Sequence, residues 1–483
     1  MADSGVAPSP DPHDHPIPAG TVLETDPRAR VIGADLVAGG QPWRLLRLPA
    51  ASRAALERWR SGLPVAPDEG ALARVMVERG LVHPRPAAPV PLDDVDVVVP
   101  TRGASDALAG LLSALRGLAV TVVDDGSHDP DLAATCAAAG AALVTLERHE
   151  GPSAARNAGV AATRRPVVAF VDDDVILADP GDALGRLRAA LEDPRVGAVA
   201  PRVVGPAGPG LRAGYEHRHG ALDQGEAPAL VDPRGPVTFV PSACLLVRRD
   251  ALGTGFDPTL AIGEDVDLVW RVLDAGWLVR YLPSVVVAHP ARPSWRAWWR
   301  QRRVYGLTSA PLAERHGERL APIRADRWTL AAWGGLLAGS PSLAASVLAR
   351  ALERARRGPL AGLEHPERVA VAVVGGNVAR AAGPLARAMV RTYGPALLVA
   401  TLHPRLRRRA LAVLALGLAW RLRGGRVRPL DVPLALLDDL AYGLGVLEGA
   451  WRHRSLQTLT PRATPSPSWG EVLGLAAGGS ADP

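Results

Sequence analysis

Three consecutive carboxylates, Asp172, Asp173 and Asp174, follow directly after five apolar residues at 167–171. Such a run predicts a buried parallel strand whose carboxyl end reaches solvent, the edge where open α/β sheets bind ligands. Adjacent carboxylates repel one another, and their oxygens suit Mg²⁺ or Mn²⁺ together with a phosphate-bearing ligand. An acidic, solvated turn after a strand would give the same pattern. The neighbouring motifs decide between these two interpretations.

Further motifs follow two strands that are predicted earlier in the chain, at 96–100 and 120–123. The first strand leads into Pro100, Thr101 and Arg102, and the second leads into Asp124 and Asp125. Because the carboxyl ends of parallel strands meet at one edge of a sheet, these residues are expected to lie beside the acidic triplet.

The segment at 151–159, Gly-Pro-Ser-Ala-Ala-Arg-Asn-Ala-Gly, is predicted to open a helix. The free N–H groups and the positive dipole end of a helix favour a phosphate, and Arg156 adds a cation that can form two hydrogen bonds to it. Taken singly, these motifs are ordinary structure: a strand exit, a type I turn, and an N-cap at Ser153. Their occurrence together, in this order, indicates a nucleotide and phosphate site.

Alternating strands and helices position these motifs. Helices are predicted at 105–115, 131–139 and 153–163, and further strands at 142–146 and up to Asp172. Repeated strand–helix units with short connections predict an α/β domain with right-handed crossovers and a parallel sheet. Because neither GxGxxG after the first strand nor GxxxxGK[ST] occurs, a dinucleotide-binding oxidoreductase and a P-loop enzyme are not expected.

The motifs VVPTR, VDDGS, GxxxARNxG and DxD, in this order, resemble the family 2 glycosyltransferases of the GT-A fold over residues 92 to about 290. The resemblance implies a nucleoside-diphospho-sugar donor and a divalent metal, Mn²⁺ or Mg²⁺. It implies these roles: Thr101 and Arg102 along the nucleotide, Asp125 accepting from the base, Arg156 facing base or phosphate, Asp172 and Asp173 contacting ribose and metal, and Asp174 the main metal ligand.

Two more residues complete the expected chemistry. Glu264 and Asp265 begin an amphipathic helical pattern, where the helix dipole favours carboxylates in any case and would keep them acidic. The family's ED motif implies that Asp265 is the general base on the face opposite the diphosphate, so that the sugar inverts. Asp267 should point elsewhere, because two residues turn a helix by about 200°. His289 matches a position of a third metal ligand in GT-A enzymes, although a histidine after a strand is often structural.

The predicted acceptor side departs from the family. Residues 237–247 are predicted to form strand, turn and strand, with Pro241, Ser242 and Ala243 where a glycine-rich loop usually lies, which suggests an unusual acceptor. In the segment 293–306 the QxxRW motif of processive members is incomplete, so processive polymerisation is not expected. An interfacial helix, an aromatic platform for the acceptor and a packed helix all fit this Arg/Trp-rich segment.

Composition limits the partners. The chain carries a formal charge of +6, yet all 55 basic residues are Arg and none is Lys, as expected from a GC-rich genome. A nucleic-acid partner is not expected, because no recognition motif accompanies the charge. Cys136 and Cys244 lie in apolar surroundings, which predicts buried thiols in a reducing compartment.

Five segments are predicted along the chain. Residues 1–18 and 463–483 are expected to be disordered, since they are rich in Pro, Ser, Gly and Asp; the first has no apolar segment of a signal peptide. Residues 19–90 combine short strands, at 30–32 and 43–48, with two helices and resemble winged-helix-like peptide-recognition modules; a plain cap is the alternative. Residues 91–310 form the GT-A domain, and residues 311–462 are helical.

The helical region raises the question of a membrane. Residues 328–349 run for 22 residues without a charge, which is long enough to span a bilayer, although Pro341 interrupts the run. The later apolar runs, 392–402 and 410–420, are too short to span singly. Helices that pack together against the inner face of the membrane are expected, with a true span as the alternative. The transferase domain would then face the cytosol.

The order of domains resembles the mycofactocin biosynthesis glycosyltransferases of actinobacteria. That resemblance implies transfer of glucose from UDP-glucose to a peptide-derived redox cofactor precursor, with short β-linked oligosaccharides as product. Two alternatives stay open at this point. One is a transferase that acts on a polyprenyl phosphate or a cell-wall glycan, and the other is a non-catalytic, membrane-associated scaffold that binds peptides.

Overall fold

The structure, a computed structural model, describes residues 6–11, 14–32, 36–358, 360–361, 365–423 and 427–464. The chain divides into two compact units. The first contains Met1–Arg30, Gly39–Trp43 and Ala50–Ala291, and the second contains Val31–Ala38, Arg44–Pro49 and Arg292–Pro483. The boundary near residue 291 differs from the predicted one at 310, because the helix after Arg292 packs with the C-terminal helices.

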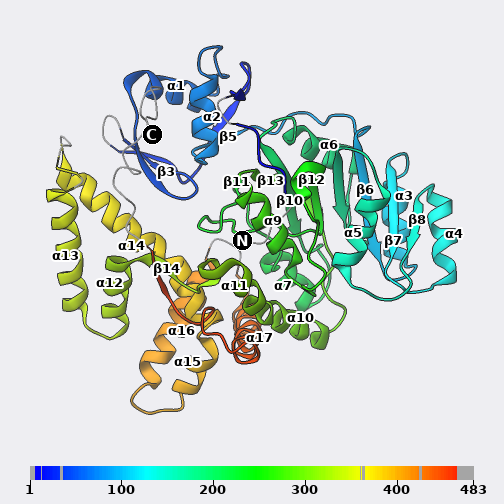
Figure 1. The fold of residues 1–483 in the computed structure, drawn as a ribbon. Coiled ribbons are helices and arrows are strands. Elements are labelled where there is room, and N and C mark those ends of the chain that lie inside the picture. Colours follow the sequence, from blue (N-terminus) through cyan, green and yellow to red (C-terminus); the bar gives the residue numbers. More distant parts are fainter. Residues whose placement is uncertain are drawn as a thin grey trace. The chain divides into compact units, whose positions relative to one another are not determined.

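An eight-stranded sheet forms the centre of the first unit, in the order β11-β13-β10-β12-β9-β6-β7-β8 (Figure 1). The strands are β6 (Val95–Thr101), β7 (Ala119–Asp124), β8 (Ala142–Thr145), β9 (Val167–Val171), β10 (Val196–Val204), β11 (Ala229–Leu230), β12 (Cys244–Arg248) and β13 (Leu278–Ala288). The predicted parallel sheet is confirmed for β8, β7, β6 and β9, which run parallel. β12 lies antiparallel between β9 and β10.

Helices cover the sheet and end at recognisable caps. They are α3 (Asp106–Ala114), α4 (Pro130–Ala139), α5 (Pro152–Ala162), α6 (Pro180–Ala190), α7 (Leu211–His219), α8 (Arg249–Leu252) and α9 (Glu264–Asp274). Ser105 caps α3 by accepting the Leu108 N–H, and Gly140 ends α4 in the left-handed conformation. Gly159 lets α5 approach the sheet, since a Cβ there would lie 2.3 Å from Val98 Cγ1. The helix that carries Arg156 is thus pressed against β6.

In this unit, one prediction about the strands needs correction and one about the cysteines is confirmed. Residues 237–247 are not strand, turn and strand: only Cys244–Arg248 is a strand, because residues 237–241 are irregular and Ser242 and Ala243 form a turn. Cys136 and Cys244 are both free and buried, as predicted.

The N-terminal segments contain α1 (Ala50–Arg60), α2 (Gly70–Glu78) and short strands. β1 (Leu23–Thr25) pairs antiparallel with β5 (Val82–Pro84), while β2 (Arg30–Ile32), β3 (Leu36–Gly39) and β4 (Arg44–Arg47) form a three-stranded sheet. The two predicted helices and the strand at 30–32 are present. β1, β3 and β5 were not predicted, since runs of three or four residues carry little periodicity.

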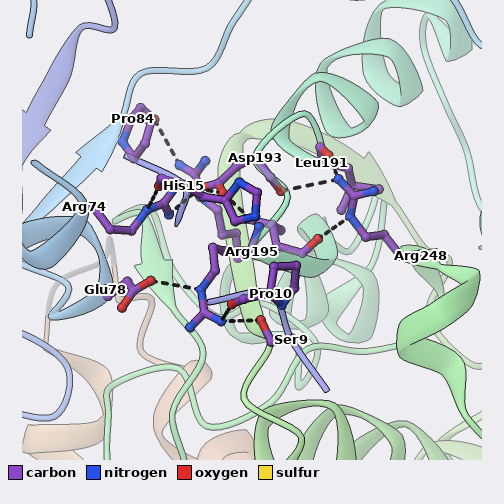
Figure 2. A network of polar contacts seen from close by, with 12 residues as sticks. Ser9, Pro10, His15, Arg74, Glu78, Pro84, Leu191, Asp193, Arg195 and Arg248 are labelled. Atoms are coloured by element: carbon purple, nitrogen blue, oxygen red, sulfur yellow. Dashed lines mark hydrogen bonds and ion pairs between the residues drawn. The ribbon is translucent and has the colours of Figure 1, made fainter. Parts of the chain in front are cut away.

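Arginines hold the N-terminal segment in place within the first unit, as Figure 2 shows. Arg195 donates to Glu78 Oε1 at 3.0 Å and also contacts Ser9 and Pro10. Arg74 forms two hydrogen bonds of 2.9 Å to Asp193. The prediction that residues 1–18 are disordered is therefore wrong for 6–11 and 14–18, because buried arginines and the backbone of this segment satisfy each other. The predicted C-terminal tail lies outside the described residues, apart from 463 and 464.

The second unit is mainly helical. Its elements are α10 (Trp295–Leu307), α11 (Ser309–His316), η2 (Gly317–Leu320), α12 (Arg327–Leu337), α13 (Pro341–Arg357), α14 (Pro366–Arg391), α15 (Gly394–Ala400), α16 (Arg407–Leu422) and α17 (Asp431–Arg452), with β14 (Arg324–Asp326) parallel to β15 (Arg462–Thr464). A Cβ on Gly306 would lie 2.0 Å from Tyr442 O, and one on Gly445 would lie 1.9 Å from Arg303 O. Of the three interpretations of the Arg/Trp-rich segment, the structure shows the packed helix, α10 on α17.

The uncharged run at 328–349, for which a true span was the alternative, does not form a single helix. α12 ends at Leu337 and α13 begins at Pro341, because proline fits the first turn of a helix but not its interior. In the described part of the chain, length and composition qualify one helix, α14, to cross a membrane.

Candidate active site

The carboxyl ends of β6 and β9 bring the first motif to the acidic triplet. β6 pairs in parallel with β9, and Thr101 Oγ1 lies 2.6 Å from Asp173 Oδ2. The same hydroxyl lies 2.9 Å from Gly103 O, so it joins the two loops. Pro100 belongs to β6, and Arg102 is exposed beside it. The expected convergence of these strand ends is confirmed, and Arg102 keeps its charge open to solvent.

Asp173 is held next to two like charges. Burial raises the pKa of Asp173, the hydrogen bond from Thr101 opposes that rise, and the charges of Asp174 and Asp172 add to it. Like charges at this spacing disfavour ionisation. A cation bound at the edge would therefore be stabilised by the triplet.

Asp124 and Asp125 are both buried, and the loops around them satisfy both carboxylates. Asp124 accepts the backbone N–H of Ser127 at 3.0 Å. Asp125 accepts the backbone N–H of Glu150 at 2.7 Å and lies 2.6 Å from His149 Nδ1. Asp125 therefore orients the loop after β8, and the residue that this loop presents is the histidine.

His149 is a site candidate that the sequence did not indicate. Its side chain is 51% exposed while its Nδ1 is held by the buried carboxylate of Asp125. A ring fixed on one side and open on the other can present a flat face and Nε2 to a ligand. No signal in the sequence pointed to it, because it lies 24 residues from its partner and outside every motif.

Arg156 occupies a different environment from the one predicted. Its side chain is 5% exposed and donates to Asp172 Oδ1 at 2.7 Å and to Glu264 Oε1 at 2.9 Å. Burial alone would lower the pKa of Arg156, but the two carboxylates outweigh burial and raise the pKa above its ordinary value. A guanidinium that is buried in this way needs anionic partners. Arg156 thus joins the end of β9 to the start of α9 instead of lying open to a phosphate.

The ion pairs of Arg156 change the expected roles of its two partners. Asp172, predicted to contact ribose and metal, has one oxygen engaged with Arg156. Glu264, which was predicted to lie beside the general base Asp265, is buried and is also engaged with Arg156. Because one guanidinium bonds both carboxylates, the acidic triplet and the first turn of α9 must lie side by side. This proximity is the central feature of the site.

Asp174 and His289 form the pair that most resembles a metal site. His289 Nε2 lies 3.2 Å from Asp174 Oδ1, and His289 Nδ1 lies 3.1 Å from Pro290 O. A carbonyl at Nδ1 fixes the tautomer that leaves Nε2 free to bind metal. Reciprocal backbone hydrogen bonds between Ile176 and Ala288, of 2.8 and 3.1 Å, hold the two loops together.

The side-chain atoms of Asp174 and His289 suit Mn²⁺ or Mg²⁺ as ligands. An imidazole nitrogen and carboxylate oxygens fit Mn²⁺, and the open positions suit the oxygens of a diphosphate. Within the described ranges, no group of three or more His, Cys, Asp or Glu side chains is arranged to hold a metal. Asp174 and His289 could hold such an ion as a pair, with the oxygens of a bound nucleotide as its other ligands.

Asp265 begins α9 in a partly buried position. Its Oδ1 accepts the Val266 N–H at 2.8 Å, and the backbone of Ser242 also hydrogen-bonds to it. Burial, followed by the charge of Glu264, raises the pKa of Asp265 to about 7. This direction is opposite to the one expected for a carboxylate at a helix terminus, because burial disfavours the charged form. Asp267 points away, as predicted, and bonds Arg271 at 2.8 Å.

Two further elements support this arrangement. Asn157, a member of the GxxxARNxG motif, exchanges hydrogen bonds of 2.7 and 2.8 Å with the backbone of Phe256 and so anchors the loop before α9. Ala243 O accepts the Asp172 N–H at 2.9 Å. The residues in place of a glycine-rich loop thus brace the triplet and Asp265. The motif contained the signal for Asn157, but nothing in the sequence indicated the role of Ser242.

Comparisons with known proteins agree with this architecture. The family model described as glycosyl transferase family 2 matches residues 96–256. A pre-mycofactocin glycosyltransferase of Mycobacterium tuberculosis is 39% identical over 473 residues, which cover 92% of this chain and 98% of that protein. An N-acetylglucosaminyl-diphospho-decaprenol L-rhamnosyltransferase of the same species is 34% identical over 39% of this chain and 68% of that protein.

Among solved structures, the mannosyltransferase PcManGT from Pyrobaculum calidifontis, in complex with GDP-Man and Mn²⁺, is similar with a TM-score of 0.44. It is 18% identical, and the match covers 83% of this chain and 96% of that one.

Proposed function

Because this chain belongs to the pre-mycofactocin glycosyltransferases, within glycosyltransferase family 2, we propose that it transfers a sugar with inversion to a hydroxyl of a peptide-derived redox cofactor precursor. The donor we propose is UDP-glucose, and the product is a short β-linked oligosaccharide. The observation that carries the proposal is the ion pair of Arg156 with both Asp172 and Glu264, which joins the donor edge to the start of α9.

The donor lies along the edge of the sheet in this proposal. Arg102 is exposed at the end of β6 and offers a cation to the nucleotide. His149, held by Asp125, lies at the neighbouring strand end and presents its open face to the base. Asp125 acts on the nucleotide base through His149. Arg156 is a positioning residue that acts through the carboxylates of Asp172 and Glu264.

Asp174 and His289 would hold the divalent ion, with Asp172 and Asp173 adding negative charge around it. When bound, the ion supplies electrostatic stabilisation of the departing diphosphate. Asp173 keeps its hydrogen bond to Thr101, so that the triplet stays oriented toward the edge.

Asp265 is the proposed general base. Its raised pKa of about 7 suits a group that must take a proton from a hydroxyl near neutral pH. The acceptor oxygen forms the new bond to the anomeric carbon, its proton goes to the Asp265 carboxylate, and the bond to the diphosphate breaks on the opposite face. Glu264 takes no proton in this scheme; it holds Arg156 and raises the pKa of its neighbour.

The test is sugar transfer from radiolabelled UDP-glucose with Mn²⁺, in extracts that contain the peptide-derived acceptor. Asp265→Asn is expected to lower kcat by roughly 10²–10⁴-fold while leaving UDP binding unchanged. Asp274→Asn, at the exposed end of the same helix, is the matched control and should retain activity. Equal activity of the wild type and Asp265→Asn would refute the assignment of Asp265 as the general base. A wild type that does not bind UDP with Mn²⁺ would favour the alternative of a non-catalytic scaffold that binds peptides.

A lipid-linked acceptor is the second candidate. The observation that favours it is the similarity of the transferase domain to an enzyme whose name states a decaprenol-linked acceptor. Partition of the radiolabelled product separates the two candidates, since a lipid-linked product enters organic solvent and a cofactor precursor stays in water. For either acceptor we propose a location at the inner face of the membrane.

A further inference from the structure

Two helix turns of the second unit expose apolar side chains instead of burying them. In the turn between α15 and α16, Val399 is 68% and Leu402 is 82% exposed, and Leu406 and Leu411 are exposed beside them. In the turn between α12 and α13, Leu336, Leu337 and Leu343 are exposed. Large apolar patches are uncommon on soluble proteins and mark interaction surfaces.

The two turns meet. A Cβ placed on Gly339, in the α12–α13 turn, would lie 3.4 Å from Arg409 Nη2, at the start of α16. We call this surface the arginine tip and define it as residues 336–343 and 399–411. Both turns belong to the same compact unit, and in Figure 1 they lie at the same end of its yellow and orange helices.

The charge of the arginine tip has one sign. Arg405, Arg407, Arg408 and Arg409 are all exposed among the leucines. From Arg368 to Leu430 the sequence contains twelve arginines and no Asp or Glu. That stretch contributes no carboxylate to the tip, which favours a partner that carries negative charge.

We propose that the arginine tip docks this protein on the surface of a bilayer that contains anionic lipids. Leucines such as Leu402 enter the boundary between headgroups and acyl chains, while the arginines extend to the phosphates. A protein partner would need apolar and acidic groups interleaved in the same way, whereas an anionic bilayer offers both over any area.

Docking at the surface fits the structure better than insertion of α14. That helix contains Arg380 and Arg387 and packs against α12, α13 and α16, and Trp333 Nε1 of α12 donates to Val378 O within it at 3.1 Å. Spanning would place two arginines in hydrocarbon and break these contacts. The inference deepens the proposed location at the membrane and rests on it, but it does not depend on the donor or the acceptor.

The test is sedimentation of the full chain with two kinds of vesicle, phosphatidylcholine alone and phosphatidylcholine with phosphatidylglycerol. The wild type should bind the anionic vesicles, and binding should weaken with salt. The variant Arg405→Ser/Arg407→Ser/Arg408→Ser should lower the partition coefficient about 100-fold, since each arginine near the surface contributes about fivefold. Leu402→Ser should weaken binding at high salt, where the leucines carry more of it.

The matched control removes the same charge elsewhere in the unit. Arg350→Ser/Arg354→Ser/Arg357→Ser changes exposed residues of α13 about 20 Å from its start and should bind like the wild type. Equal binding by the tip variant, or equal binding to neutral vesicles, would overturn the proposal. Self-association that the tip variant abolishes, without vesicle binding, would instead assign the surface to a second copy of the chain.

UDP binding, measured on the same preparations, keeps the two proposals apart. Tip variants that lose vesicles but bind UDP support docking. A wild type that binds vesicles but not UDP refutes the proposed transferase function and leaves docking intact.

Discussion

Adjacent aspartates occur in both compact units, as Asp172 to Asp174 after β9 and as Asp438 and Asp439 within α17. In the helix, Arg302 Nε lies 3.0 Å from Asp438, Arg421 bonds the same carboxylate at 2.9 Å, and Arg421 also lies 3.1 Å from Asp439. Both helix carboxylates are at most 5% exposed. After β9, by contrast, Asp172 and Asp174 are 26% and 30% exposed.

The difference lies in where the counter-charge comes from. In α17 the fold itself supplies arginines from α10 and α16, so the acids are neutralised before any ligand arrives. After β9 the partners are a buried arginine, a hydroxyl and a histidine, which leave negative charge at an open edge. A run of acids therefore indicates a ligand site only where the chain ends a strand and leaves the acids partly uncovered.

The largest expected effect is a loss of stability when the aspartates of α17, Asp438 and Asp439, are disturbed. Asp438→Ala removes a buried carboxylate that contacts both Arg302, whose side chain is 2% exposed, and Arg421. The free energy of unfolding should fall by about 3–5 kcal/mol, measured by urea denaturation. Asp174→Ala, at the open edge, is the control and should change it by less than about 1 kcal/mol. Equal losses would mean that both clusters are structural.

The second prediction concerns Asp174 and His289, the proposed metal ligands at the open edge of the sheet. His289→Gln should weaken Mn²⁺ binding in the presence of UDP by about 10–100-fold, because it removes one of the two proposed protein ligands. Titration calorimetry with Mn²⁺ and UDP measures this change. His453→Gln, at a histidine paired with Glu314 in the second unit, should leave Mn²⁺ affinity unchanged. A variant His289→Gln with full affinity would make that histidine structural.

The pH dependence sharpens the comparison between the units. Asp265 must be ionised to accept a proton, and its pKa is raised to about 7, so kcat/KM should rise about tenfold per pH unit below 7 and level off above it. Burial also raises the pKa of Asp439, to about 6, but that residue lies in the second unit and pairs with Arg421. The residual rate of Asp265→Asn should therefore lose the slope, whereas Asp439→Asn should keep it.

The smallest effect concerns the loop after β8. His149→Ala should raise KM for the donor about three- to tenfold, the worth of one hydrogen bond or ring contact, with kcat little changed. His128→Ala, on the next loop, is the comparison variant, since its Nε2 is engaged with Glu147 O at 3.0 Å. Equal KM values for the wild type and His149→Ala would remove this histidine from the donor site.

Much of the fold could be predicted from local patterns. Helices α3, α4 and α5 and the parallel strands appear within one or two residues of the expected bounds, because periodicity, proline at the first turn and capping residues specify them locally, and α9 begins at Glu264 as expected. The turn before β12 was misplaced, and Pro341 was noted only as an interruption of a possible membrane span. In both cases a run of apolar residues satisfied the pattern while the chain turned within it.

The candidate site divides in the same way. The sequence by itself determined which residues reach the sheet edge, since strand ends and motif order place Thr101, Asp125 and Asp173 there. Only the tertiary structure decided what each does: that Arg156 is buried between two acids, that His149 is presented by Asp125, and that desolvation raises the pKa of Asp265 against the helix dipole. Spacing along the chain fixes direction and order, whereas charge balance depends on burial and on neighbours that are distant in sequence.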